Sequence, residues 1–331
     1  MNEDFEKSTG EIKKIEEPDM ILMDSCPVCG SDWLENYIET NLTNFFFPVS
    51  EEIIHKVKKE RFTLNICMQC SHVFQTNIEK DLLNLIYKEF YNHYNLDTSI
   101  EFQLIYRERT INFLKNVISA GENQKALDIG CGEGTYFSEF RKMGFDCYGI
   151  EPSPKSEIAK KKNPDAIISN EFFNNCDTNI FGTSFDVIMM NWVLEHIENI
   201  EDFFDKLKAY IKKGTTLFIQ VPDLDYYIEH NMPLFYVHEH INYFSAQTLC
   251  LLLKRKGFKI IDVVQGDSPA LLVAGEYMGI EQKIIVQNKD QIIRKKDFIV
   301  NNEALKAKVK KIISKNEKII FYGIGLLSFW I

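Results

Sequence analysis

Lys125-Ala-Leu-Asp-Ile-Gly-Cys-Gly-Glu-Gly-Thr135 joins an apolar, strand-like run to three closely spaced glycines, and a helical pattern follows. Glycine at a strand-to-helix turn lets the backbone bend tightly and approach a ligand, because no Cβ intervenes. The N-terminus of the following helix adds unpaired N–H donors and a positive dipole. The stretch therefore predicts a ligand-binding turn between a strand and a helix of an α/β domain.

Two interpretations of this turn, each with a different cofactor type, have to be distinguished. A dinucleotide fingerprint requires G-x-G-x-x-G, which would put the third glycine at position 135, where the chain has threonine. The spacing is instead G-x-G-x-G, with Asp128 just before it. Glu151 ends the next predicted strand, where a carboxylate accepts hydrogen bonds from ribose hydroxyls. Because NAD enzymes use the same device, Glu151 alone does not decide between the cofactors.

A third stretch, Phe185-Asp-Val-Ile-Met-Met-Asn-Trp-Val-Leu-Glu-His-Ile197, completes a resemblance to the class I S-adenosylmethionine (SAM) methyltransferases. It is similar to their fourth strand and the following "LEH" helix beside the methionine end of SAM. The resemblance implies SAM as cofactor and a set of cofactor-binding residues: Asp128, Gly130, Cys131, Gly132, Gly134, Glu151, Asn191 and Glu195. Cys131 also has a simpler interpretation as a packing residue.

Length, charge and composition argue against several classes of protein. The chain has 331 residues and a net charge of −10, which argues against a general nucleic-acid binder. No apolar run reaches the ~18 residues of a membrane helix, and no signal-peptide pattern opens the sequence. We therefore expect a cytoplasmic protein with no membrane partner. A small-molecule substrate is what the methyltransferase resemblance implies. Its oligomeric state stays open.

Four of the eight cysteines form two C-x-x-C pairs. Two such turns present four thiolates to one tetrahedral metal ion, so we expect a structural zinc site. A redox C-x-x-C is the alternative, but two pairs favour metal. His72 lies beside the second pair and is expected to be a bystander. The predicted ligands are Cys26, Cys29, Cys67 and Cys70.

A histidine-rich stretch, Tyr236-Val-His-Glu-His-Ile-Asn-Tyr-Phe-Ser245, follows the fifth predicted strand. Histidine moves protons near neutral pH, and a neighbouring carboxylate can orient it. There are two alternatives to a role in proton transfer. His238 and His240 could bind a metal ion, or the histidines could have a purely structural role. Tyr91 and Tyr94, in a tyrosine-rich segment, are interpreted either as interfacial packing residues or as hydroxyls that reach the substrate.

The order of these motifs resembles the sugar C-methyltransferases that act on nucleotide-linked 4-keto deoxysugars, over roughly residues 26–266. The resemblance implies that His240 removes a proton next to the ketone, assisted by Glu239 and near His238, and that the enolate attacks the SAM methyl group. Family members carry tyrosine directly before the HEH motif, whereas this chain has Val237, with Tyr236 one residue earlier. The alternatives are an O-methyltransferase acting on a sugar or surface glycan precursor and a zinc-stabilised SAM-fold binding protein without turnover.

The predicted fold class is α/β, a Rossmann-like SAM methyltransferase core with a small N-terminal zinc-binding module and a truncated C-terminal Rossmann-like segment. In the core we expect strands near 126–129, 147–151, 166–169, 187–190 and 216–221, with helices including 136–143 and 200–212. The expected organisation is a tail (1–20), a zinc-binding module (21–76), a helical linker (77–123), the methyltransferase domain (124–280) and the start of an incomplete C-terminal substrate-binding domain (281–331).

Overall fold

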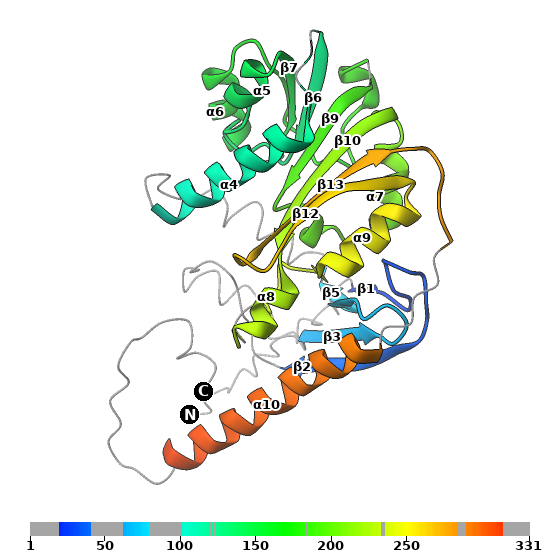
Figure 1. The fold of residues 1–331 in the computed structure, drawn as a ribbon, viewed down its shortest axis with the longest axis vertical. Coiled ribbons are helices and arrows are strands. Elements are labelled where there is room, and N and C mark those ends of the chain that lie inside the picture. The colour runs from blue at the N-terminus through cyan, green and yellow to red at the C-terminus, as the bar shows by residue number, and fades with distance from the viewer. Residues whose placement is uncertain are drawn as a thin grey trace, which may run out of the picture.

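The fold is described here from a computed structural model (Figure 1). It describes residues 20–40, 62–79, 101–119, 121, 123–182, 184–232, 236–283 and 289–313. The expectations for the tail up to residue 19, for Tyr91 and Tyr94, and for the Rossmann-like segment after residue 313 lie outside these residues.

A seven-stranded sheet forms the centre of the upper part of the molecule, in the order β12-β13-β10-β9-β6-β7-β8. The five strands from β8 to β10 run parallel, and β13 runs antiparallel to both β10 and β12. The central strands, such as β6 and β9, are buried along most of their length because both faces are covered, as in other parallel sheets. Their bounds are β6 (Gln124–Ile129), β7 (Phe145–Ile150), β8 (Ile167–Ser169), β9 (Phe185–Asn191), β10 (Ile211–Pro222), β12 (Phe258–Val264) and β13 (Ala270–Tyr277).

Helices cover both faces of this sheet. Alternate strand residues point to opposite sides, so that Leu127 and Ile129 pack with α7 and α9, whereas Ala126 packs with α4 and α5. In α7 the buried residues Ile200, Phe203, Phe204 and Leu207 recur at helical spacing. The helices of the core are α4 (Glu101–Val117), α5 (Phe137–Lys142), α6 (Lys155–Lys162), α7 (Ile200–Leu207), α8 (Leu224–Glu229) and α9 (Ala246–Arg255).

The expected helix over 200–212 is too long. Helix α7 ends at Leu207, and β10 already begins at Ile211, which pairs with Phe185 of β9. Tyr210 is fully buried, and its carbonyl accepts a hydrogen bond from the Phe185 amide at 2.8 Å. The cation-then-glycine sequence at Lys212–Gly214 therefore lies in the irregular first part of a strand, because tertiary burial of Tyr210 overrides the local helix-stop signal.

The N-terminal cysteine-containing module consists of two small sheets. One pairs β1 (Met20–Leu22) with β5 (Asn77–Glu79). The other has the order β11-β4-β3-β2 and comprises β2 (Leu34–Thr40), β3 (Phe62–Cys67), β4 (Val73–Gln75) and β11 (Asn242–Tyr243). The helical linker expected from residue 77 does not begin there, because β5 extends the module to residue 79. Strand β11 comes from the methyltransferase part of the chain, so the two parts share one sheet.

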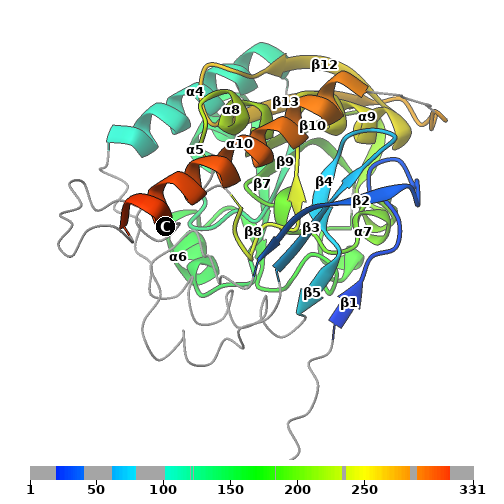
Figure 2. The same ribbon diagram turned by 90° about the horizontal axis from the view of Figure 1, so that it is seen from below.

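A long helix, α10 (Lys289–Ile313), runs along this module (Figures 1 and 2). The Lys295 side chain is fully buried, and its Nζ donates to the Ser71 carbonyl at 2.8 Å. Lys296 pairs with Glu35 of β2, and Arg294 with Glu229 of α8 at 2.6 Å. The helix is thus attached to both the cysteine module and the methyltransferase part.

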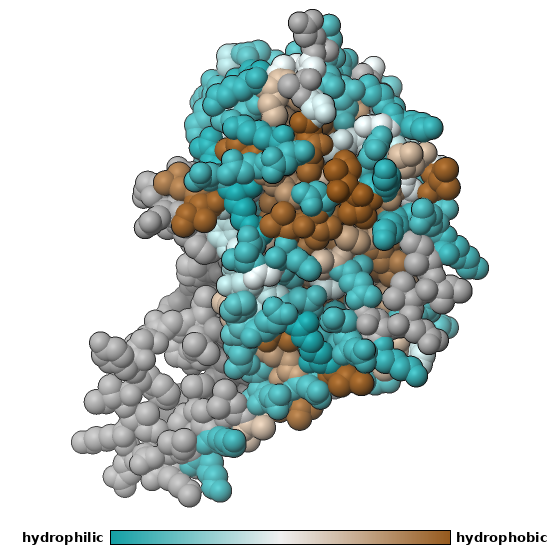
Figure 3. All heavy atoms as spheres, in the orientation of Figure 1, coloured by the Kyte–Doolittle hydropathy of each residue, from teal (hydrophilic) through white to brown (hydrophobic). Residues whose placement is uncertain are grey.

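Brown, hydrophobic residues gather on the face shown in Figure 3, over the region of β12 and β13. On β12, Ile261 is 43% exposed. Within the described part of the chain, no helix combines the length and the apolar character that crossing a membrane requires.

Candidate functional site

The glycine turn after β6 has the conformation that its sequence predicts. Gly130, Gly132 and Gly134 have φ angles of +76°, +53° and +75°, a region that favours glycine. A Cβ on Gly130 would lie 2.5 Å from Val193 Cγ2, whereas one on Gly132 would meet nothing within 4 Å. Gly130 is therefore required for packing, and Gly132 leaves open space beside the turn in which a ligand can approach the backbone.

Two carboxylates flank the turn. Glu151, directly after β7, accepts hydrogen bonds from the Gly132 amide at 2.8 Å and the Ser153 amide at 2.9 Å. Asp128 is buried, and its Oδ1 has no hydrogen-bond partner among the described residues. Burial, and then the nearby Glu151 carboxylate, hold the pKa of Asp128 well above its usual range. A cationic ligand with hydroxyl donors fits this pair of acceptors, and SAM has an ammonium, a sulfonium and a ribose diol.

Two other predicted cofactor residues lie around the same turn. Asn191, the last residue of β9, donates to the Tyr136 hydroxyl at 3.4 Å. The Cys131 thiol is buried, and a Cβ built on Gly149 would lie 2.7 Å from its sulfur. The side chain of Cys131 therefore packs against β7, as the simpler interpretation of this residue proposed.

The expected LEH helix is a single 3-10 turn, Leu194–His196. It follows Trp192, a non-glycine residue with φ of +59°. Glu195 in this turn is 1% exposed, and neither of its carboxylate oxygens has a hydrogen-bond partner within the described segments. Burial raises the pKa of Glu195 to about 8, so the carboxyl group is largely protonated at neutral pH.

The LEH turn and the histidine-rich loop meet through His196 and His240. Their rings are 4.9 Å apart in an edge-on arrangement, and His196 Nε2 is 3.7 Å from Glu195 Oε1. His196 Nδ1 is 2.7 Å from the Glu239 carbonyl, and the Ile241 amide donates to the Glu195 carbonyl at 2.8 Å. Sequence reasoning missed His196, although it is the third letter of the LEH motif.

The three members of the HEH motif have different surroundings. Burial, and then His196, hold the pKa of the His240 ring well below its usual range, so this histidine is neutral. The His238 ring instead packs 4.6 Å from the Phe62 ring, centroid to centroid. Glu239 is buried and meets His196 through its main-chain carbonyl. The metal alternative based on His238 and His240 is not supported, because the ligand-like cluster around His240 contains Glu195 and His196 and lacks His238.

The four predicted metal ligands lie together. The Sγ atoms of Cys26 and Cys70 are 3.6 Å apart, and those of Cys29 and Cys67 are 3.5 Å apart. A zinc tetrahedron with bonds of ~2.3 Å has sulfur–sulfur edges of roughly 3.8 Å, so the arrangement is compatible with zinc. All four thiols are free rather than disulfide-bonded.

The thiol electrostatics also fit a cation. Burial raises the pKa of the Cys26 thiol, whereas hydrogen bonding with Cys26 and the other thiols lowers the pKa of Cys67. Four such thiols cannot all ionise together unless a cation balances their charge. His72 is not in the cluster: its Nε2 is 3.3 Å from Asn242 Oδ1, and its ring stacks on Phe74.

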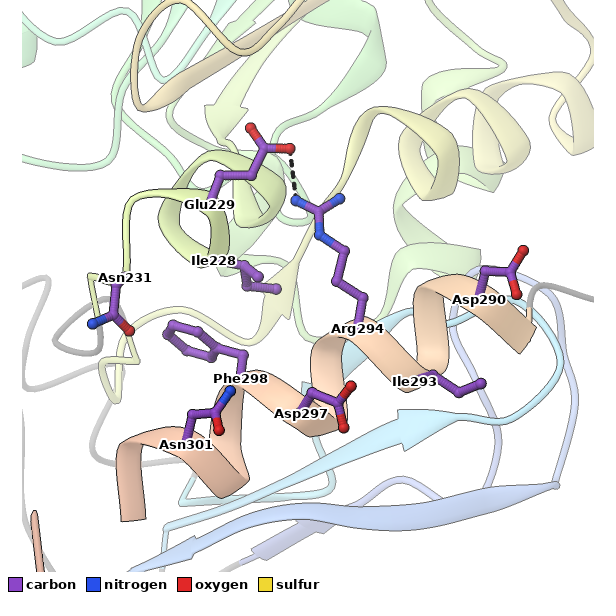
Figure 4. A pocket seen from close by; sticks show the side chains of 9 residues that line it. All are labelled: Ile228, Glu229, Asn231, Asp290, Ile293, Arg294, Asp297, Phe298 and Asn301. Carbon is purple, nitrogen blue, oxygen red and sulfur yellow. Dashed lines mark hydrogen bonds and ion pairs between the residues drawn. The ribbon is translucent and has the colours of Figure 1, made fainter. Parts of the chain in front are cut away.

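A separate open groove lies between α8 and α10 (Figure 4). Arg294 spans it toward Glu229, and Ile228 and Phe298 form part of its wall. The residues that line it include neither histidine nor cysteine, and none belongs to the glycine turn. The predicted cofactor residues Asp128, Glu151 and Asn191 lie elsewhere, at the carboxyl ends of β6, β7 and β9.

Comparison with known proteins identifies the domain that carries these residues. Residues 102–263 match the family described as methyltransferase domain. The C-methyltransferase NovU of Streptomyces niveus is 23% identical over 260 residues, which cover 74% of this chain and 58% of NovU. MJ1123 of Methanocaldococcus jannaschii is 28% identical over 170 residues, or 50% of this chain and 77% of that protein.

Other matches are to proteins named as methyltransferases of ubiquinone biosynthesis and of magnesium protoporphyrin IX. A ubiquinone biosynthesis O-methyltransferase of Pelagibacter ubique is 33% identical over 106 residues, 30% of this chain and 42% of that enzyme. Magnesium protoporphyrin IX methyltransferase of Synechocystis, solved with bound SAH, has a TM-score of 0.46 and 13% identity, covering 60% of this chain and 98% of that one. The chain thus spans less than two thirds of NovU and of the O-methyltransferase.

Strand order, glycine turn, paired carboxylates and the family match agree with one another. The protein contains a class I SAM-dependent methyltransferase domain.

Proposed function

We propose that the protein transfers the SAM methyl group to carbon, on a nucleotide-linked 4-keto deoxysugar. The single observation that carries this proposal is the position of buried His240 beside His196 and Glu195. The similarity to NovU supports it, because that match is long enough to extend beyond the methyltransferase domain alone.

The chemistry requires a base, because a carbon next to a ketone becomes nucleophilic only when its proton is removed. A neutral imidazole has the lone pair that accepts this proton. In the proposed step the C–H bond breaks, its electron pair forms the enolate, and the proton moves to His240. Carbon then forms a bond to the methyl group while the S–CH₃ bond breaks, which leaves S-adenosylhomocysteine. Bound SAM supplies the electrophilic methyl group.

The neighbours of His240 are suited to support it. The Nδ1 of His196 is held by the Glu239 carbonyl, so its Nε2 faces the Glu195 carboxyl group. A protonated carboxyl in a dry site can donate a hydrogen bond to an oxygen on which negative charge develops. We therefore assign Glu195 to stabilisation of the enolate rather than to cofactor binding. Asp128, Glu151 and the glycine turn are assigned to SAM.

We also propose that Cys26, Cys29, Cys67 and Cys70 hold a structural Zn²⁺. A site in which the protein fills all four positions has no room for a substrate. Its expected role is folding of the small module, whose buried side chains share one hydrophobic cluster with residues of α8 and α10.

The second candidate is O-methylation, favoured by the local similarity to ubiquinone biosynthesis O-methyltransferases. In that case His240 would remove a hydroxyl proton. Hydrogen exchange distinguishes the two functions. With S-adenosylhomocysteine in place of SAM, incubation of a dTDP-4-keto-6-deoxysugar in D₂O should introduce deuterium next to the ketone. His240→Asn should abolish the catalysed exchange while SAM affinity is kept. Exchange at the uncatalysed rate with the wild-type protein would refute the enolate mechanism.

A further inference from the structure

The buried side chain of Gln75, the last residue of β4, joins the cysteine module to the HEH loop. Its Nε2 donates to two main-chain carbonyls of that loop, His238 O at 2.7 Å and His240 O at 2.6 Å. Gln75 is 3% exposed, and its main-chain N–H donates to the Ile241 carbonyl at 2.8 Å. One residue of the module thus binds the loop on both sides of Glu239.

Other contacts attach the same loop to the same module. Strand β11 pairs with β4 through Asn242↔Phe74 and Tyr243↔Val73. The Tyr236 hydroxyl is 2.9 Å from that of Tyr37 on β2. Tyr236, which replaces the tyrosine expected directly before the motif, therefore faces the module.

The cysteines close the turn that places Gln75. Cys67 ends β3, and Cys70 lies in the turn before β4. The Ser71 amide donates to the Cys67 carbonyl at 2.8 Å, and the Cys67 amide donates to the His72 carbonyl at 2.8 Å. A metal ion shared with Cys26 and Cys29 would fix this turn from outside, because both pairs would coordinate it.

We propose that the cysteine module positions the catalytic loop, and that Gln75 is the residue through which it does so. This inference rests on the proposed role of His240 as base. Gln75 is a positioning residue: it touches the loop backbone. The two carbonyls that it binds need donors, since a buried carbonyl without one is costly. Without Gln75 both carbonyls lose this donor, so we expect the loop to shift and the His240 ring to move with its own main chain.

The geometry defines a matched control. Asn302 on α10 is also 3% exposed, and its side-chain amide likewise donates to a main-chain carbonyl, that of Phe298 at 2.8 Å. Asn302→Ala therefore removes the same kind of buried bond without touching the loop. Gln75→Met keeps the approximate length of the side chain and removes its donors.

The test measures amide hydrogen exchange across residues 236–243, together with zinc content and SAM affinity. In Gln75→Met we expect these amides to exchange at least tenfold faster, with zinc content and SAM affinity unchanged. Asn302→Ala should leave them at the wild-type rate. With the dTDP-4-keto-6-deoxysugar as substrate, the kcat of Gln75→Met should be about tenfold to a hundredfold lower than that of the wild type. The KM for SAM should be unchanged, as expected for a misplaced catalytic group.

Metal removal from the intact wild-type chain provides an independent test if Gln75→Met does not fold. Chelation should accelerate exchange in residues 236–243 while the glycine turn keeps its protection and SAM still binds. Unchanged loop exchange after both Gln75→Met and chelation would overturn the inference, as would faster exchange with unchanged kcat. Because exchange is measured without substrate, this result is independent of whether the acceptor is a keto sugar.

Discussion

Gly130→Ala is the substitution whose effect on the free energy of unfolding follows most directly from the structure. Gly130 has φ of +76°, and its added Cβ would lie 2.5 Å from Val193 Cγ2. The left-handed conformation costs an alanine roughly 1–2 kcal/mol. Forcing a methyl group into a packed neighbour costs roughly 1–3 kcal/mol more. We expect Gly130→Ala to lower the free energy of unfolding by about 2–5 kcal/mol.

Gly182→Ala is the matched control, because it carries only the first of these costs. Its φ is +56°, and the nearest atom to an added Cβ, the Asn179 carbonyl oxygen, is 3.8 Å away. We expect a loss of about 1–2 kcal/mol there. Urea unfolding of both variants, followed by tryptophan fluorescence and circular dichroism, measures the difference.

A double mutant tests the cause. Val193→Ala removes the clashing methyl group, so Gly130→Ala should cost about 1–3 kcal/mol less in that background than in the wild type. The reasoning is refuted if Gly130→Ala and Gly182→Ala cost the same, or if the Val193→Ala background gives no relief. Either result would mean that Gly130 does not pack against the LEH turn.

Three further predictions test other parts of the account. Glu151→Gln should weaken SAM binding about tenfold or more by calorimetry, because hydrogen bonds to a charged group contribute roughly 1.5–3 kcal/mol. The exposed control Glu157→Gln should leave the SAM affinity unchanged. Equal SAM affinities of Glu151→Gln and the wild type would remove Glu151 from the cofactor site. Because the pKa of Glu195 is raised from 4.5 to about 8, the folded state retains a proton that the unfolded state releases, so this group's contribution is complete below pH 4.5 and is lost as the pH rises to about 8. Stability of the wild type should therefore fall by several kcal/mol, roughly 3–5, relative to Glu195→Gln across that range, and parallel pH profiles would contradict the shift. Cys29→Ser should reduce bound zinc from about one ion per chain toward zero by mass spectrometry, whereas Cys250→Ser should retain it; equal zinc contents would argue against the four-cysteine site.

Much of the methyltransferase core could be predicted from the sequence because its signals are local. The glycine turn needs positive φ at fixed spacing, and the buried parallel strands are apolar runs that end in Asp128-Ile129 and, at the second strand, Glu151. The cysteine cluster could be predicted equally well, because two C-x-x-C turns indicate one tetrahedral site whatever loop joins them. The structure brings these four thiols together as expected.

The remaining features depend on contacts between distant residues. The LEH segment forms one 3-10 turn because the loop that carries His240 packs directly on it, which no helical periodicity indicates. Likewise, Gln75 and His240 are 165 residues apart in sequence, and nothing local marks Gln75 as their link. Sequence reasoning could name the histidines but could not separate His238, which packs on Phe62, from His240, which joins His196.

The most direct test of the proposed function is carbon-13 NMR of the product formed from methyl-labelled SAM and a dTDP-4-keto-6-deoxysugar. We predict a labelled methyl group bonded to the carbon next to the ketone, with a shift typical of an aliphatic C–CH₃, and loss of this product in His240→Asn. A labelled methoxyl signal from the same reaction would contradict carbon methylation and establish oxygen as the acceptor.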